Sequence, residues 1–177
     1  MKKRLNVVRA SGPTSVGAVP IAMSVRAFVA NLLVCLVPGL MIGGVLSVVF
    51  SAPPAPESVE IFESAHWLRA VFLLCIFAPL VENCVLLYPA HLISQAVRSH
   101  WLVCVISATP LVLAHGYPDR WEKSIAVAWS FIWLVHCFFV LKAKGVSLQS
   151  RFWFIFGLHA GVNAVLLGLV RLAKLIL

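Results

Sequence analysis

Five long apolar stretches, separated by short polar connections, constrain the fold of this sequence more than any other feature. A helix that crosses a membrane needs about 20 consecutive, mostly apolar residues. The hydrocarbon core holds no water to bond backbone N–H and C=O groups, so each stretch has to form a helix that satisfies them internally. We therefore predict an all-α fold, a polytopic transmembrane helix bundle of about five spans, over residues 25–50, 67–93, 101–115, 124–141 and 152–170.

The small number of charged residues supports this prediction. Asp, Glu, Lys and Arg make up 11% of the 177 residues, against about 25% in a soluble domain, so the folded surface is expected to face lipid. The length suits one compact unit: residues 25–177 form a single transmembrane domain, and residues 1–24 form a basic cytoplasmic tail. The net charge of +8 is distributed between the apolar stretches, which favours membrane lipid as the partner and no nucleic acid.

Side chains inside the apolar stretches add two expectations. All five cysteines lie there, without the paired spacing seen in exposed loops. We interpret them as small buried apolar residues and not as disulfides or zinc ligands. Four prolines are expected to kink the helices or to end them early: Pro38, Pro79, Pro89 and Pro110.

The distribution of basic residues predicts the orientation of the chain. Short cytoplasmic loops carry an excess of Lys and Arg. With the N-terminus in the cytoplasm, that side collects nine of the 14 basic residues, whereas five of the six acidic residues lie on the other side. We therefore expect the N-terminus inside and the C-terminus outside. The nine basic residues are Lys2, Lys3, Arg4, Arg9, Arg26, Arg98, Lys142, Lys144 and Arg151.

The sixth acidic residue, Glu82, lies in the middle of the second apolar stretch. A charged side chain there costs about 2.5 kcal/mol or more, so it is expected to face a cavity and to have a function. The alternative is a protonated Glu82 that bonds a neighbouring helix. As a functional group, a carboxylate at this depth is a candidate general base.

Three further polar residues are expected near the same depth. His115 closes the third stretch, and His159 and Asn163 lie four residues apart in the fifth. This spacing places both side chains on one face of a helix. Each residue alone is explained by a bond between helices, but together with a buried Glu82 they indicate a site.

These residues resemble the motifs of the CAAX-protease and bacteriocin-processing (CPBP) family of glutamic intramembrane proteases. The family motifs are Glu-Glu-x-x-x-Arg, Phe-x-x-x-His and His-x-x-x-Asn, in this order on successive helices. Here Glu82 is similar to the leading Glu, Leu111-Val-Leu-Ala-His115 to the second motif, and His159-Ala-Gly-Val-Asn163 to the third. The chain departs from the pattern at Asn83, Leu87 and Leu111, which stand where the family has the second Glu, the Arg and the Phe.

The resemblance implies a bacterial inner-membrane protease that uses neither metal nor cofactor. Glu82 and His115 would hold and deprotonate a water, and His159 and Asn163 would donate to the developing oxyanion. Asn83 would have a secondary role in the site. The partner would be a peptide or protein substrate with a cleavage site close to the membrane.

Other classes of function stay open at this point. A non-catalytic relative, such as an immunity, scaffold or assembly factor, would keep the fold without the activity. A b-type haem protein would use two histidines as axial ligands, from His91, His115, His136 and His159. A zinc protease is less favoured, because the sequence has no His-Glu-x-x-His.

One expectation conflicts with a shared site. At about 1.5 Å per residue, straight helices place His115 about 21–24 Å below the cytoplasmic surface and His159 about 12 Å below it. Helix stagger, helix tilt or a surface helix over residues 94–100 has to bring the two together.

The orientation is testable with reporter fusions after Arg9, Glu60 and Lys144. Because the basic loops are expected in the cytoplasm, the three fusions should report inside, outside and inside. Detection of the Glu60 fusion on the cytoplasmic side would overturn the orientation.

Overall fold

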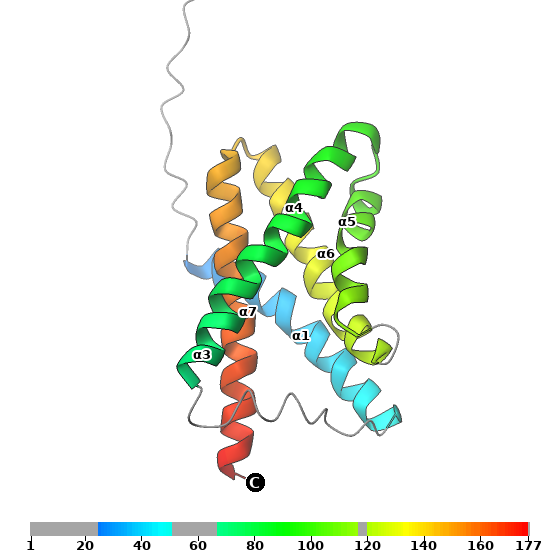
Figure 1. Cartoon of the computed structure of the whole chain (residues 1–177). Helices are drawn as coiled ribbons and strands as arrows, with labels where there is room; N and C mark the ends of the chain where they lie inside the picture. The colour runs from blue at the N-terminus through cyan, green and yellow to red at the C-terminus, as the bar shows by residue number, and fades with distance from the viewer. Residues whose placement is uncertain (1–24, 51–66, 117–119, 177) are drawn as a thin grey trace, which may run out of the picture.

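The computed structural model describes residues 25–50, 67–116 and 120–176, which form a bundle of helices (Figure 1). The tail over residues 1–24 and the acidic connection over residues 51–66 lie outside this part of the chain. The elements are α1 (Val25–Phe50), α3 (Trp67–Phe72), the π-helical turn η2 (Leu73–Phe77), α4 (Ala78–Ala96), α5 (His100–Ala114), α6 (Trp121–Ala143) and α7 (Leu148–Ile176).

The expected membrane helices are present, with one difference in length. Four helical segments are long and apolar enough to cross a membrane: Val25–Leu46, Trp67–Ala96, Trp121–Ala143 and Leu148–Ala173. The third predicted stretch forms α5, an apolar helix of only 15 residues. No strand occurs in the described part of the chain. The protein is therefore a multi-pass membrane protein, and its described part is all-helical, with four long apolar helical segments and one short one.

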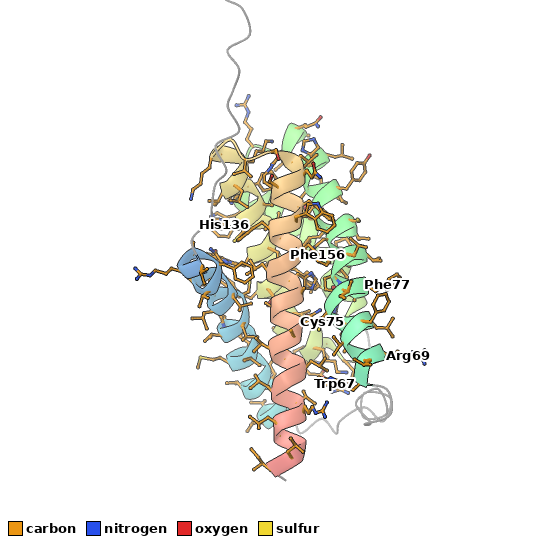
Figure 2. All side chains as sticks on the ribbon, turned by 90° about the vertical axis from the view of Figure 1, so that its left-hand side faces the viewer. Trp67, Arg69, Cys75, Phe77, His136 and Phe156 are labelled. Carbon is orange, nitrogen blue, oxygen red and sulfur yellow. The ribbon has the colours of Figure 1, made fainter. Side chains whose placement is uncertain are left out.

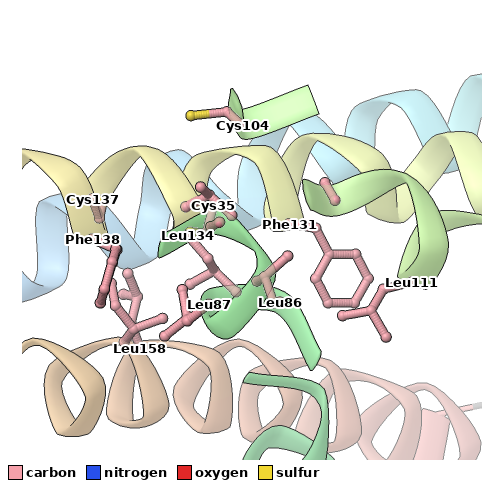
Figure 3. Close-up of a cluster of buried hydrophobic side chains, with 14 of the residues drawn as sticks. Cys35, Leu86, Leu87, Cys104, Leu111, Phe131, Leu134, Cys137, Phe138 and Leu158 are labelled. Carbon is pink, nitrogen blue, oxygen red and sulfur yellow. The ribbon is translucent and has the colours of Figure 1, made fainter. Parts of the chain in front are cut away.

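The surface of the bundle agrees with lipid as its solvent. Large apolar side chains are widely exposed, including Leu68 at 82% and Val48 at 80%. Such a surface would associate or aggregate in water. The interior is a single cluster in which Leu86 and Leu134 are almost fully buried (Figure 3).

The helices from α3 onward run alternately up and down, and α1 packs across α6 and α7 (Figure 1). The α4–α5 and α6–α7 connections lie at the same end of the bundle. At the opposite end, the guanidinium of Arg171 in α7 lies 4.4 Å from the ring centroid of Trp67. Figure 2 shows Trp67 and Arg69 at this start of α3. The segment α3–α4 therefore crosses α7 and diverges from it toward the end where the α4–α5 connection lies (Figure 1).

Of the two effects expected of the prolines, kinking a helix or ending it, the second does not occur at three of the four. Pro38, Pro89 and Pro110 lie inside α1, α4 and α5. Proline has no N–H, so the carbonyl four residues before it loses its usual donor. In a membrane, such a carbonyl needs a partner from elsewhere in the protein.

The carbonyl released by Pro38 shows how this partner is supplied. The indole Nε1 of Trp129 in α6 donates to the Val34 carbonyl at 2.8 Å. The next carbonyl, of Cys35, accepts from the Ser130 hydroxyl at 2.8 Å. The helices can approach closely here because a Cβ on Gly39 would lie 2.9 Å from the Ala126 carbonyl oxygen. The proline of α1 therefore creates the polar contact that joins α1 to α6.

This contact predicts a coupling between Pro38 and Trp129. Trp129→Phe removes the donor and should lower the free energy of unfolding in detergent by about 0.5–2 kcal/mol. In a Pro38→Ala background the restored amide can bond Val34, so the same substitution should cost much less. Trp133→Phe is the matched control, because its indole N–H has no partner. Equal losses for Trp129→Phe in both backgrounds would contradict this account.

Candidate functional site

The candidate site is centred on Glu82, near the middle of the 30-residue helical segment Trp67–Ala96. Its carboxylate faces histidines from two other helices. Glu82 Oε2 lies 3.2 Å from Nε2 of His159 in α7, and Oε1 lies 3.8 Å from Nε2 of His115 at the end of α5. The first distance is that of a hydrogen bond, and the second is not. Three residues that are far apart in the sequence thus form one cluster.

Helix stagger and tilt close the gap in depth that the sequence implied. α7 begins at Leu148 and not near residue 152, so His159 lies about 16 Å from the helix start, compared with about 22 Å for His115 in α5. α4 and α5 are also tilted in the bundle (Figure 1). No surface helix forms, because α4 continues to Ala96 and α5 begins at His100.

Each of the two histidines is held by its other ring nitrogen. His115 Nδ1 lies 2.8 Å from the Leu111 carbonyl, and since a carbonyl only accepts, Nδ1 carries the proton. His159 Nδ1 lies 3.1 Å from Asn83 Oδ1, which is also an acceptor. Fixing the proton on one ring nitrogen leaves the other available for chemistry. When they are neutral, both rings therefore present the lone pair of Nε2 to Glu82.

This arrangement requires one proton to be shared between Glu82 and His159. A lone pair of Nε2 and a carboxylate oxygen repel each other unless a proton lies between them. The proton resides either on the carboxyl group or on a doubly protonated imidazole ring. In both cases the pair contains a proton donor and a proton acceptor in direct contact, with 20% of the Glu82 side chain exposed.

Asn83 is fully buried, and its side-chain oxygen orients the imidazole ring of His159. From the sequence, Asn83 was expected to have a secondary role in the site, at the position where the family has its second Glu. In the structure its amide oxygen is the acceptor that fixes the His159 tautomer. Its Nδ2 has no hydrogen-bond partner in the described part of the chain.

Asn163 has a different contact from the one expected. Its Nδ2 donates to the Leu74 carbonyl at 2.7 Å. Leu74 lies in the π-helical turn, where the Ala78 N–H bonds to Leu73 and Pro79 has no N–H to offer. The Asn163 amide thus satisfies a carbonyl that the π turn exposes, and one of its two N–H groups remains for the cavity.

Two residues that the sequence did not indicate complete the site. Phe131 of α6 packs edge-on against both imidazole rings, with centroids 5.1 Å from His115 and 5.6 Å from His159. Figure 3 shows it beside Leu111. Gly116 follows His115 in a turn where a Cβ would lie 2.0 Å from the Arg120 carbonyl oxygen, so only glycine fits. Aromatic residues are common in apolar stretches, and Phe131 therefore carried no signal in the sequence.

A cavity of about 300 Å³ opens onto these groups. Glu82, His115, His159 and Asn163 all line it, together with Ser130. A second hollow of about 230 Å³ lies between α1, α6 and α7 and shares several lining residues with the first. The shared residues are Val127, Ser130, Val162 and Leu166. The two hollows are therefore neighbours, and these four residues line both.

The remaining candidate residues lie elsewhere. His136 bonds to His100 at 2.8 Å and is stacked between Trp101 and Trp133, so it is not brought to Glu82. Of the cysteines, Cys84 is exposed and not buried as expected, and all five are free. Within the described residues, no group of three His, Cys, Asp or Glu side chains is placed to hold a metal ion.

Comparisons with known proteins leave the chain without an assigned family. No protein-family model matches it, and no curated protein or solved structure is significantly similar to it.

The tautomers of the two histidines can be measured by ¹⁵N NMR on histidine-labelled protein. At a pH where the rings are neutral, both should carry the proton on Nδ1. Asn83→Leu removes the acceptor, so His159 should shift toward the Nε2–H form and donate to Glu82, while His115 stays unchanged as an internal control. A native His159 already protonated on Nε2 alone would contradict the orientation described for Asn83.

Proposed function

We propose that this protein is an intramembrane endopeptidase that hydrolyses a peptide bond with a water activated by Glu82. The observation that carries the proposal is the convergence of His115 and His159 on the carboxylate of Glu82 at a cavity within the bundle. A buried carboxylate with oriented imidazole partners is an arrangement suited to general acid–base catalysis. It also agrees with the resemblance of the sequence to the CPBP proteases.

We place the attacking water between Glu82 and His115, whose facing atoms are too far apart to bond each other. Glu82 Oε1 and His115 Nε2 are 3.8 Å apart, so one water can donate a hydrogen bond to each. Glu82 takes a proton as the water oxygen attacks the carbonyl carbon, and the same proton then passes to the leaving amine. The water supplies both new groups, so no covalent enzyme intermediate forms.

Stabilisation of the oxyanion would come from the opposite side of the carboxylate. The second N–H of Asn163 is the available donor, and a protonated His159 would add its positive charge, since both residues line the cavity. Donors of this kind contribute most in a site that excludes water. Asn163 would thus have two roles, because its first N–H already bonds the π turn.

The substrate we propose is a membrane-inserted peptide segment or a protein tail cleaved near the membrane. The hollow along α1 offers a lateral route to the cavity, and α1 is the least buried of the long helices, with 17% of its apolar window buried. We place the protein in a bacterial cell membrane with its N-terminus in the cytoplasm, as the charge distribution and the resemblance suggest.

Substitution of Glu82 tests the proposal. Glu82→Gln keeps the size and hydrogen bonding of the side chain but cannot accept a proton, so proteolysis should fall by about 10²-fold or more. The measurement is a quantitative comparison of new protein termini in membranes from cells that express the native or the substituted chain.

Glu122→Gln is the matched control, because Glu122 is paired with Arg120 at the start of α6, away from the cavity. It should leave the pattern of termini unchanged, and both variants should accumulate to native levels. Identical termini in cells expressing the native chain and Glu82→Gln would sink the proposal and favour a non-catalytic membrane protein.

A further inference from the structure

Arg151, in the first turns of α7, is a buried cation without an anionic partner. Its side chain is 7% exposed, and both Nε and Nη1 are buried with no hydrogen bond. Its guanidinium lies over the ring of Phe138, 4.5 Å from the centroid. A buried charge without a counter-charge is strongly destabilising, so an anion from outside the chain is expected next to it.

Neither of the two acidic residues in the described part of the chain, Glu82 and Glu122, is paired with Arg151. Glu82 is engaged by the two histidines, and Glu122 by Arg120 at the start of α6. The other four acidic residues fall outside the described part of the chain, in the segments that lead into Trp67 and Trp121. These helix starts lie at the end of the bundle opposite Arg151 (Figure 1). The first 24 residues contain no acid at all.

The end of the bundle that holds Arg151 is also electropositive. The two connections there carry Arg98, Lys142 and Lys144, with no acidic residue between positions 94 and 100 or between positions 142 and 151. The N-terminus of α7 adds the positive end of a 29-residue helix. Basic residues between helices at a membrane surface attract anionic lipid headgroups.

A large apolar cavity has Phe138, the ring that contacts Arg151, among its lining residues. It has a volume of about 890 Å³ and lies between α4, α6 and α7, with Phe138 in its wall. This is within the range of about 300–1,000 Å³ that is usual for ligand pockets. Figure 3 shows Phe138 at the interface of α6 with α7, close to Leu158. Phe138 thus contacts the Arg151 guanidinium and also lines the cavity.

Two polar atoms among the residues that line the cavity also have no partner. They are Asn83 Nδ2, from a side chain that is fully buried, and His91 Nδ1. Buried polar atoms in native proteins are normally hydrogen-bonded.

We propose that Arg151 and the cavity beside it form a binding site for one anionic phospholipid. The phosphate pairs with the Arg151 guanidinium at the start of α7, and an acyl chain occupies the cavity lined by Leu87, Tyr88, Leu148 and Phe152. The ligand is a lipid and not a free anion, because the charge and the apolar cavity are adjacent. The site is separate from the cavity that holds Glu82.

Native mass spectrometry of the whole protein, released from vesicles of phosphatidylcholine with a minority of phosphatidylglycerol, tests this site. The native protein should retain one phosphatidylglycerol in preference to phosphatidylcholine. Arg151→Gln should reduce this retention about 10-fold or more, as expected for loss of a desolvated charge pair. Arg98→Gln removes the same charge from an exposed position at the same end and should retain the lipid.

Two further variants separate lipid binding from effects on folding. Leu148→Trp should reduce retention by filling the cavity while Arg151 remains. If Arg151→Gln does not fold, Arg151→Lys should fold and keep a preference for phosphatidylglycerol. Equal retention of the two lipids by the native protein, or equal losses for Arg151→Gln and Arg98→Gln, would overturn the proposal. Displacement of the lipid by millimolar inorganic phosphate would show a free-anion site instead.

Discussion

The burial of the Glu82 carboxylate in the middle of a membrane bundle is the constraint on which the rest of the structure depends. A charge at that depth is expensive unless polar groups surround it. Here the surrounding groups come from α5 and α7, which therefore have to meet α4 at one level. The short length of α5, the early start of α7 and the turn at Gly116 all serve this meeting. The two histidines are in turn held by the Leu111 carbonyl and the Asn83 side chain. The groups that contact Glu82 are thus themselves positioned by hydrogen bonds.

The same physical rule explains how the bundle uses its prolines. Each proline inside a membrane helix releases a carbonyl that has no water to bond. At Pro38 the carbonyl is satisfied by Trp129, and at the π turn before Pro79 the exposed carbonyl of Leu74 is satisfied by Asn163. These bonds join α1 to α6 and α7 to the second helical segment. Carbonyls that lack a partner within their own helix thus form specific hydrogen bonds between helices. Such bonds matter here because lipid provides no hydrophobic driving force for helix association.

Much of the fold was predictable from the sequence because lipid leaves few alternatives for an apolar stretch. The helix positions follow from apolar length, and Glu82, His115 and His159 stand out because polar groups are costly at that depth. The contacts were less predictable. The bond from Asn163 to Leu74 depends on a π turn that has no signature in the sequence, and Phe131 is one aromatic residue among many. The unpaired state of Arg151 depends on which side chains the fold brings near it, so it is visible only in three dimensions.

The central claim is that Glu82 activates a water for direct attack on a peptide bond. The most direct test is single-turnover cleavage of a membrane segment, chosen from the termini found in cells, by purified protein in lipid nanodiscs made with H₂¹⁸O. The account predicts one ¹⁸O atom in the new carboxyl terminus and an unchanged intact mass of the protein throughout the reaction. A transient increase in protein mass equal to the acyl fragment, or no cleavage by the purified chain, would contradict it.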